Sequence, residues 1–225
     1  MNRTGWIMLC VGAVLSLMSG CNIAGALERV TSPDRTVEAR YVLADVPTVV
    51  FLDDRRNQIN PVRLRREIVD EVTQILTVEG KLNDMISPRD AMAAARRLDT
   101  ARETVGVDRV GRAVGAQQVV YIEAIAFRIT QDGLMPDPAA FFNIRVLDLD
   151  AGRRVFPTED GLQQTGGYHI QVSIPRQELA TLSGTGNASK LRQVLAQRAG
   201  DEIGRLFVRT GYGAGGERLM NIENQ

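Results

Sequence analysis

The chain contains few of the residues that build covalent links or metal sites. Its 225 residues include one histidine, His169, and two cysteines, Cys10 and Cys21. That number is too small for a self-contained metal centre of the usual histidine and cysteine kind. We therefore expect no metal site, and nothing in the sequence points to a cofactor.

Lysine is also scarce, and neither sign of charge is in excess. Only Lys81 and Lys190 are lysines among 27 basic residues, and these balance 27 acidic residues. We attribute the scarcity of lysine to codon usage. Because a basic excess is lacking, binding to nucleic acid through bulk charge is disfavoured. With 44% hydrophobic and 24% charged residues, the chain has the composition of an ordinary globular protein.

The first twenty residues have the order of an export signal. Arg3 is followed by an uncharged apolar core from Trp6 to Met18, and then by the small residues 19–20. The run Met18-Ser19-Gly20-Cys21 resembles the bacterial lipobox, in which the cysteine is acylated and becomes the first residue of the mature chain. Asn22 follows Cys21, which in the enterobacterial rule favours the outer membrane. We expect a lipid on Cys21 and a location on the periplasmic side of the cell envelope.

The alternative is an uncleaved anchor helix. No charged residue occurs from Thr4 to Leu27, a stretch long enough to cross a bilayer of roughly 30 Å. The strongly apolar part ends at Met18, however, which is short of the ~20 residues that a span needs. Both interpretations tether the folded part to a membrane outside the cytoplasm. If the signal is removed and Cys21 carries lipid, the mature chain has no free thiol, which excludes disulfides and thiol catalysis.

The remaining chain predicts one domain. We expect a lipidated tether at 21–39, a single domain at 40–210 and a flexible tail at 211–225. The predicted strands cover 40–52, 85–86, 118–129, 141–149, 153–156 and 168–174, and the predicted helices cover 61–77, 88–98, 103–114 and 188–209. Spacing of four residues predicts helix-face ion pairs Arg63–Glu67 and Arg66–Asp70. The order of elements predicts an α+β fold, a mixed α/β sandwich in which about four helices cover a mixed sheet of about four to six strands.

Candidate catalytic chemistry is scarce. His169 lies on the polar face of its predicted strand, and the sequence indicates neither a hydrogen-bond partner nor a pocket for it. We therefore expect it to be exposed. The loop Asp53, Asp54, Arg55 and Arg56 follows the first strand, a position where α/β proteins often place sites. No second acidic cluster accompanies it, so a solvated loop is one interpretation and a polar interaction loop the other. Residues 184–190 lack the glycine and hydroxyl positions of a phosphate loop. We assign no catalytic residue.

Four segments carry a resemblance to a known family. They are Thr48–Leu52, the helix at 61–77, Gly111–Glu123 and the hairpin Val146–Val155. This pattern resembles a bacterial envelope domain found in curli-secretion-type lipoproteins, in the amino-terminal domain of TolB-type proteins and in lipoprotein activators of peptidoglycan synthases. The resemblance covers about Arg40 to Phe156. It implies a non-enzymatic protein that assembles, activates or docks on envelope machines.

Three classes of function follow. The first is a lipid-anchored periplasmic adaptor that docks on an envelope protein assembly. The second is an accessory lipoprotein of an export or transport system that forms homo-oligomers. The third is an enzyme or small-ligand binder that uses Asp53, Asp54 and Arg56. A contiguous apolar patch would favour the first, a ring-like oligomer the second, and a deep pocket beside the loop the third.

Overall fold

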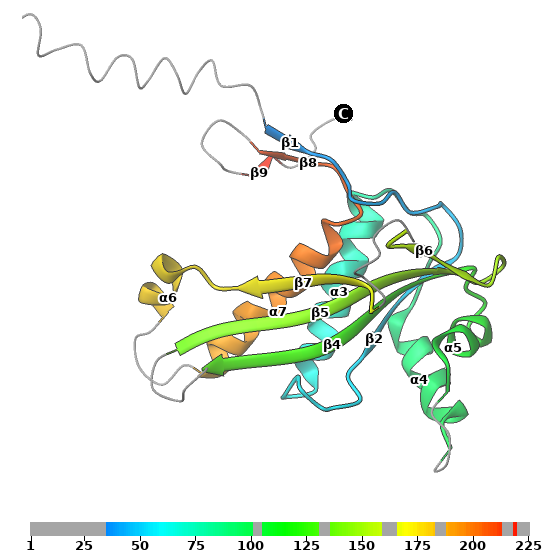
Figure 1. Ribbon diagram of the computed structural model, residues 1–225, viewed down its shortest axis with the longest axis horizontal. Coiled ribbons are helices and arrows are strands. Elements are labelled where there is room, and N and C mark those ends of the chain that lie inside the picture. Colours follow the sequence, from blue (N-terminus) through cyan, green and yellow to red (C-terminus); the bar gives the residue numbers. More distant parts are fainter. Residues whose placement is uncertain are drawn as a thin grey trace, which may run out of the picture. The chain divides into compact units, whose positions relative to one another are not determined.

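A computed structural model gives the architecture of the chain (Figure 1). It describes residues 35–100, 105–130, 136–158, 166–182, 188–212 and 218–219. Cys21 and the expected export signal at 1–20 lie outside these residues. The chain divides into two compact units, one formed by residues 39–209 and the other by residues 1–38 together with 210–225.

The larger unit is built on a mixed sheet of six strands. Its order is β3-β2-β4-β5-β6, and β7 pairs with β5 beside β6. The strands are β2 (Thr48–Asp53), β3 (Met85–Ile86), β4 (Gln118–Thr130), β5 (Pro136–Asp148), β6 (Arg153–Phe156) and β7 (Tyr168–Ser173). β2 runs parallel to β3 and β4, whereas the other pairings are antiparallel.

Helices cover both faces of this sheet. The helices are α3 (Arg63–Val78), α4 (Pro88–Leu98), α5 (Val107–Ala113), α6 (Arg176–Leu182) and α7 (Ala188–Gly204). Val120 and Ile122 of β4 face a core formed with α3 and α7, and the alternate residues Val119 and Tyr121 face a second core formed with α4 and α5. This alternation follows from the two-residue period of a strand, and Figure 1 shows the two pairs of helices on different sides of the sheet. The predicted α+β class and the range of four to six strands are confirmed.

Several boundaries differ from the prediction for identifiable reasons. The first strand of the sheet begins at Thr48 and not at Arg40, because residues 40–47 pass the end of α7, where the N–H of Arg40 donates to the carbonyl of Leu206 (2.7 Å). α3 begins two residues after Pro61, and α7 ends at Gly204 and not at 209. The sequence also did not predict α6, a short helix in which no residue is buried. Without a buried stripe, no apolar period marks such a helix.

The smaller unit contains three short antiparallel strands. These are β1 (Arg35–Val37), β8 (Thr210–Tyr212) and β9 (Arg218–Leu219), in the order β1-β8-β9. The sequence predicts a tether at 21–39 and a flexible tail at 211–225, and these strands lie partly within those segments. Strands of two or three residues are too short for an alternating pattern to reveal them.

Candidate functional site

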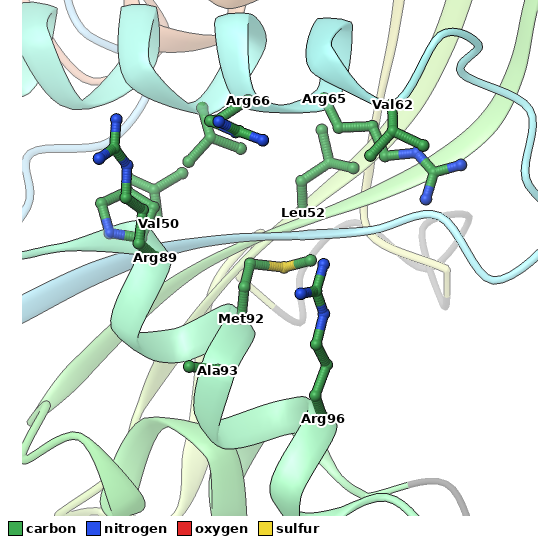
Figure 2. Close-up of a pocket in the computed structure, with 11 residues that line it drawn as sticks. Val50, Leu52, Val62, Arg65, Arg66, Arg89, Met92, Ala93 and Arg96 are labelled. Atoms are coloured by element: carbon green, nitrogen blue, oxygen red, sulfur yellow. The ribbon is translucent and has the colours of Figure 1, made fainter.

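An arginine-lined groove lies between α3 and α4 at the outer edge of β2. β3 pairs with β2 only at Thr48 and Val49. Beyond Val49, no strand of the described chain lies beside the outer edge of β2. A pocket of about 270 Å³ opens there, and Figure 2 shows α3 on one side of β2 and α4 on the other. We call this site the β2-edge groove.

Four arginines line the groove. Arg65 and Arg66 come from α3, and Arg89 and Arg96 come from α4. Figure 2 shows Arg66 extending from α3, and Arg89 and Arg96 extending from α4, into the space between the two helices. The result is a concentration of positive charge in a chain whose net charge is zero.

The helical period explains why α4 presents this face. Arg89, Met92, Ala93 and Arg96 recur at intervals of three and four residues, so they share one side of the helix. The opposite side carries small residues that pack against the sheet, and these are Ala91, Ala94 and Ala95. Burial of the alanine stripe therefore turns the arginines and Met92 toward α3.

Three of the four arginines form no ion pair with any residue that the structure describes, although Asp53, Asp54 and Asp99 line the neighbouring pocket with Arg96. Arg65 donates from Nε to Asp54 at 2.9 Å and to the carbonyl of Ile59 at 3.2 Å. Within the described residues, the side chains of Arg66, Arg89 and Arg96 make no hydrogen bond or ion pair. Like charges that converge without a counterion repel one another, so the groove is suited to receive an anion.

The predicted ion pairs of α3 have different outcomes. Arg63 and Glu67 form theirs, with 3.6 Å between nitrogen and oxygen. The pair Arg66–Asp70 is not present in the described part of the chain, and Arg66 lines the groove instead.

The floor of the groove is apolar. Val50 and Leu52 of β2 lie at its base, and Val69 of α3 and Met92 of α4 flank them. Val62, just before α3, is also part of the lining, and 53% of it is exposed. Guanidinium groups above an apolar floor suit a ligand that is both anionic and partly apolar.

The groove continues along β2 into a second pocket. This pocket of about 170 Å³ shares Leu52, Arg65, Met92 and Arg96 with the first. It extends past Asp53 to Arg55. The lining thus follows the outer edge of the strand from Val50 to its end.

The predicted loop forms the far end of this groove, but its acids are not solvated. The Asp53 side chain is 10% exposed and accepts from the Tyr121 hydroxyl and from Arg55 Nε, both at 2.8 Å. The Asp54 side chain is 1% exposed and accepts the N–H groups of Gln58 (2.7 Å) and Ile59 (2.9 Å). The interpretation as a solvated loop is therefore wrong for the two acids, because Asp54 accepts the N–H groups of the turn into α3 and Asp53 accepts from Tyr121 of β4 and from Arg55. Arg55 and Arg56 are exposed, and a role in interaction stays a prediction for them.

Tyr121 has the perturbed acidity of a buried phenol. Its burial, reinforced by the hydrogen bond to Asp53 and the charges of Asp53 and Glu123, raises the pKa of Tyr121 well above the ordinary value. The Arg145 guanidinium lies 5.2 Å from the Tyr121 ring centroid and forms an ion pair with Glu123 at 2.6 Å. The phenol therefore stays protonated near neutral pH and acts as a donor that positions Asp53.

His169 is exposed, as expected. Its Nδ1 lies 3.2 Å from Asn143 Oδ1, and its ring stacks on Phe141 with 6.1 Å between centroids. Among the residues that the structure describes, no group of three or more histidines, cysteines, aspartates or glutamates is arranged to hold a metal ion. In the same part of the chain, no helix has the length and apolar character to cross a membrane.

Comparisons with known proteins find structural likeness only. No protein-family model and no curated protein matches the sequence. Solved structures similar to this one include the PelC dodecamer of Paraburkholderia phytofirmans, with 13% identity, a TM-score of 0.42, and coverage of 78% of this chain and 97% of that chain. Lipoprotein GNA1162 of Neisseria meningitidis has 10% identity and a TM-score of 0.40, with coverage of 67% and 94%. The LpoB C-terminal domain of Salmonella enterica has 16% identity and a TM-score of 0.37, with coverage of 60% and 87%.

These structures include a lipoprotein, which is the class of protein that the sequence resemblance names. At TM-scores below 0.5 the likeness carries no conclusion about the function of this chain. Apart from Asp53, Asp54 and Arg55 at its far end, the residues of the β2-edge groove were not predicted as a site. The sequence signal that could have indicated them is the face of α4 on which two arginines flank Met92, opposite the alanine stripe.

Proposed function

We propose that this protein is a non-enzymatic accessory protein of the bacterial cell envelope, held on the membrane by a lipid on Cys21. Its folded domain docks on an envelope protein through the β2-edge groove. The observation that carries the proposal is the convergence of Arg66, Arg89 and Arg96, without acidic partners in the described chain, over an apolar floor.

The chemistry of the groove supports binding over catalysis. Arginine is protonated at every physiological pH, so it binds anions but does not act as a general base. The nearby carboxylates of Asp53 and Asp54 are each held by internal donors. A site whose charged groups are either permanently protonated or already bonded is suited to recognition.

The sequence supports the location. An apolar core that precedes Cys21 and the lipobox-like run around it are typical of exported lipoproteins. Asn22 favours the outer membrane as the place of the anchor. A domain tethered in this way stays close to its membrane and meets other envelope proteins there.

The experiment is site-specific photo-crosslinking in the native envelope. A photoreactive amino acid at Ala93, an exposed residue of the groove lining, should crosslink the partner. The same probe at Gln197, an exposed residue of α7 on the other side of the sheet, is the control and should not. Crosslinks from Ala93 to a second copy of this chain would favour the homo-oligomeric export accessory. The absence of any protein crosslink at Ala93 would contradict docking at this groove.

A small anionic ligand is the second candidate, because a pocket does lie beside the loop Asp53–Arg56. It would be favoured if Ala93 gave no protein crosslink and the purified protein carried a bound anion detectable by native mass spectrometry.

A further inference from the structure

We propose that the β2-edge groove takes an extended, acidic segment of the partner protein, which adds to the sheet beside β2. This inference rests on the proposed docking function and specifies its chemistry. It is carried by three observations: an unpaired strand edge, a lining that follows this edge, and arginines on both walls.

The strand edge is open where the groove lies. The N–H of Thr48 donates to Asp84, on the β3 side of β2, whereas the carbonyl of Pro47 accepts from Gln117 and Gln118, on the β4 side. Backbone groups of successive residues in a strand point to opposite sides. Leu52, four residues after Thr48, therefore directs its N–H and C=O away from β4 and toward the groove. The ladder to β3 ends at Val49, so no strand of the described chain receives these groups.

An unpaired N–H and C=O at a strand edge are the groups that an added strand uses in β-augmentation. Val50 to Asp53 span about 13 Å at roughly 3.3 Å per residue, and the two pockets together line this length. A peptide of four or more residues fits lengthwise, whereas a compact anion would use only one end. The length of the lining therefore favours an extended peptide.

The side chains of the added strand would contact the two helices. Alternate residues of such a strand point toward α3, which carries Arg66 and Val69, and toward α4, which carries Arg96 and Met92. Each wall thus offers at least one guanidinium that forms no ion pair in the described part of the chain, together with an apolar contact. A segment with acidic and apolar residues on both of its faces matches both walls, and arginine binds carboxylates with two parallel hydrogen bonds.

Entry requires a small rearrangement. Only 5% of Leu52 is exposed, and Figure 2 shows Met92 extending toward β2. Methionine is unbranched and changes rotamer readily. Its side chain can move aside when a peptide occupies the edge.

The test measures binding of the peptide Val-Glu-Glu-Val-Glu-Glu-Val, labelled with fluorescein, by fluorescence anisotropy. Its period of three places both glutamate and valine on each face of an extended strand. The protein is the full-length lipidated chain in a non-ionic detergent. We expect saturable binding that weakens as salt is added. A peptide with lysine in place of each glutamate should not bind.

Two adjacent residues provide the matched variants. Arg96→Ala should weaken binding about tenfold, because it removes a charge-assisted contact. Arg97→Ala changes the next residue of the same helix, which is exposed and outside the groove lining, and should leave the affinity unchanged. Equal effects of the two variants would overturn the proposed site.

Backbone pairing is tested on the peptide, so that the protein is unchanged. One set of alternate amides is N-methylated in one peptide, and the other set in a second peptide. Because only one set can face β2, one peptide should lose binding and the other should keep it. Equal affinity of the two N-methylated peptides would overturn strand addition.

Other occupants of the groove would give different results in these binding and crosslinking experiments. Arg96-dependent binding to phosphatidylglycerol vesicles or inorganic phosphate, without binding of the peptide, would overturn the inference in favour of a phosphate group. A partner crosslinked at Ala93 with no peptide binding would overturn the inference and leave the docking function in place. Peptide binding with no crosslinked partner would support the binding of an acidic strand in the groove and would contradict docking on an envelope protein.

Discussion

The four residues from Asp53 to Arg56 are neighbours in sequence with opposite surroundings. The Asp54 carboxylate lies inside the turn between β2 and α3, where it accepts two backbone N–H groups and pairs with Arg65. Asp53 faces Tyr121, whereas Arg55 and Arg56 are exposed. Buried backbone N–H groups need an acceptor, and Asp54 supplies it. The acids therefore hold the groove in shape. Arg55 pairs with Asp53, and both Arg55 and Arg56 are exposed to solvent.

Replacing Asp54 should destabilise the protein. Asp54→Ala leaves two N–H groups without their acceptor and removes the anionic partner of the Arg65 guanidinium, and we expect a loss of about 3 kcal/mol in the free energy of unfolding. Urea unfolding followed by circular dichroism measures this loss. Arg56→Ala, two residues away at an exposed position, should change the stability by less than about 0.5 kcal/mol. A similarly small effect of Asp54→Ala would contradict the structural role.

Tyr121 should make stability depend on alkaline pH. Its pKa in the folded chain is raised, mainly by burial, and in the unfolded chain it is about 10. The folded state therefore holds the proton more tightly. This contribution to stability is fully present below about pH 10 and is lost as the pH rises toward the folded pKa.

Tyr121→Phe provides the comparison, because phenylalanine keeps the ring and cannot ionise. Above about pH 10, urea midpoints of the wild-type protein should fall more steeply than those of Tyr121→Phe. Parallel curves for the two proteins would show that Tyr121 is not the residue responsible.

At the scale of elements, α3 and α7 approach closely because α7 has glycines on its contact side. A Cβ at Gly200 would lie 2.6 Å from Glu71 Cβ and 2.9 Å from the carbonyl oxygen of Ile68. A Cβ at Gly204 would likewise lie 2.9 Å from Cδ1 of Ile75. Glycine is a poor helix former, so its presence at both positions reflects packing. This packing holds α3 in place as one wall of the groove.

Gly200→Ala separates helix propensity from packing by the sign of its effect. The higher helix propensity of alanine than of glycine would by itself stabilise the helix by about 1 kcal/mol. The clash with α3 should instead destabilise the protein by about 1–3 kcal/mol. Thermal or urea unfolding measures the difference, with Gln197→Ala at an exposed position of α7 as the control. A gain in stability for Gly200→Ala would contradict the close contact.

At the scale of the whole molecule, the proposed function needs a folded domain and a segment that holds this domain at the membrane. The domain carries the groove, and the proposed anchor is Cys21, near the other end of the sequence from the last helix of the domain. The two features can be tested separately, because Cys21 and the residues of the groove lie in different segments of the sequence.

Cys21→Ser should release the protein from the membrane fraction. Serine cannot form the thioether through which a lipobox cysteine is acylated, so detergent would no longer be needed to extract the chain. Fractionation and immunoblotting measure the distribution, and Cys10→Ser, in the apolar core of the signal, is the matched control that should remain membrane-bound. Unchanged retention of Cys21→Ser would favour the uncleaved anchor helix.

Local patterns in the sequence determined most of the elements. The apolar stripe of α3 and the alternation of β7 each have a period that a short segment reveals by itself. Strand β4 is instead a run that is apolar on both faces, as a strand covered on both sides is, and the structure confirms all three elements. A period reports which side of an element is buried. For this reason the α+β class could be predicted before any contact between segments was known.

The groove was decided by tertiary structure alone. It exists because β3 stops after two residues, so that in the described chain no strand pairs with the outer edge of β2 beyond Val49, while Arg66 of α3 and Arg96 of α4 come together from separate segments. A helical spacing rule paired Arg66 with Asp70, yet the packing of α3 beside α4 places it in the groove. The reason is physical: periodicity acts over one or two turns of chain, whereas the convergence of charges depends on contacts between elements that are distant in sequence.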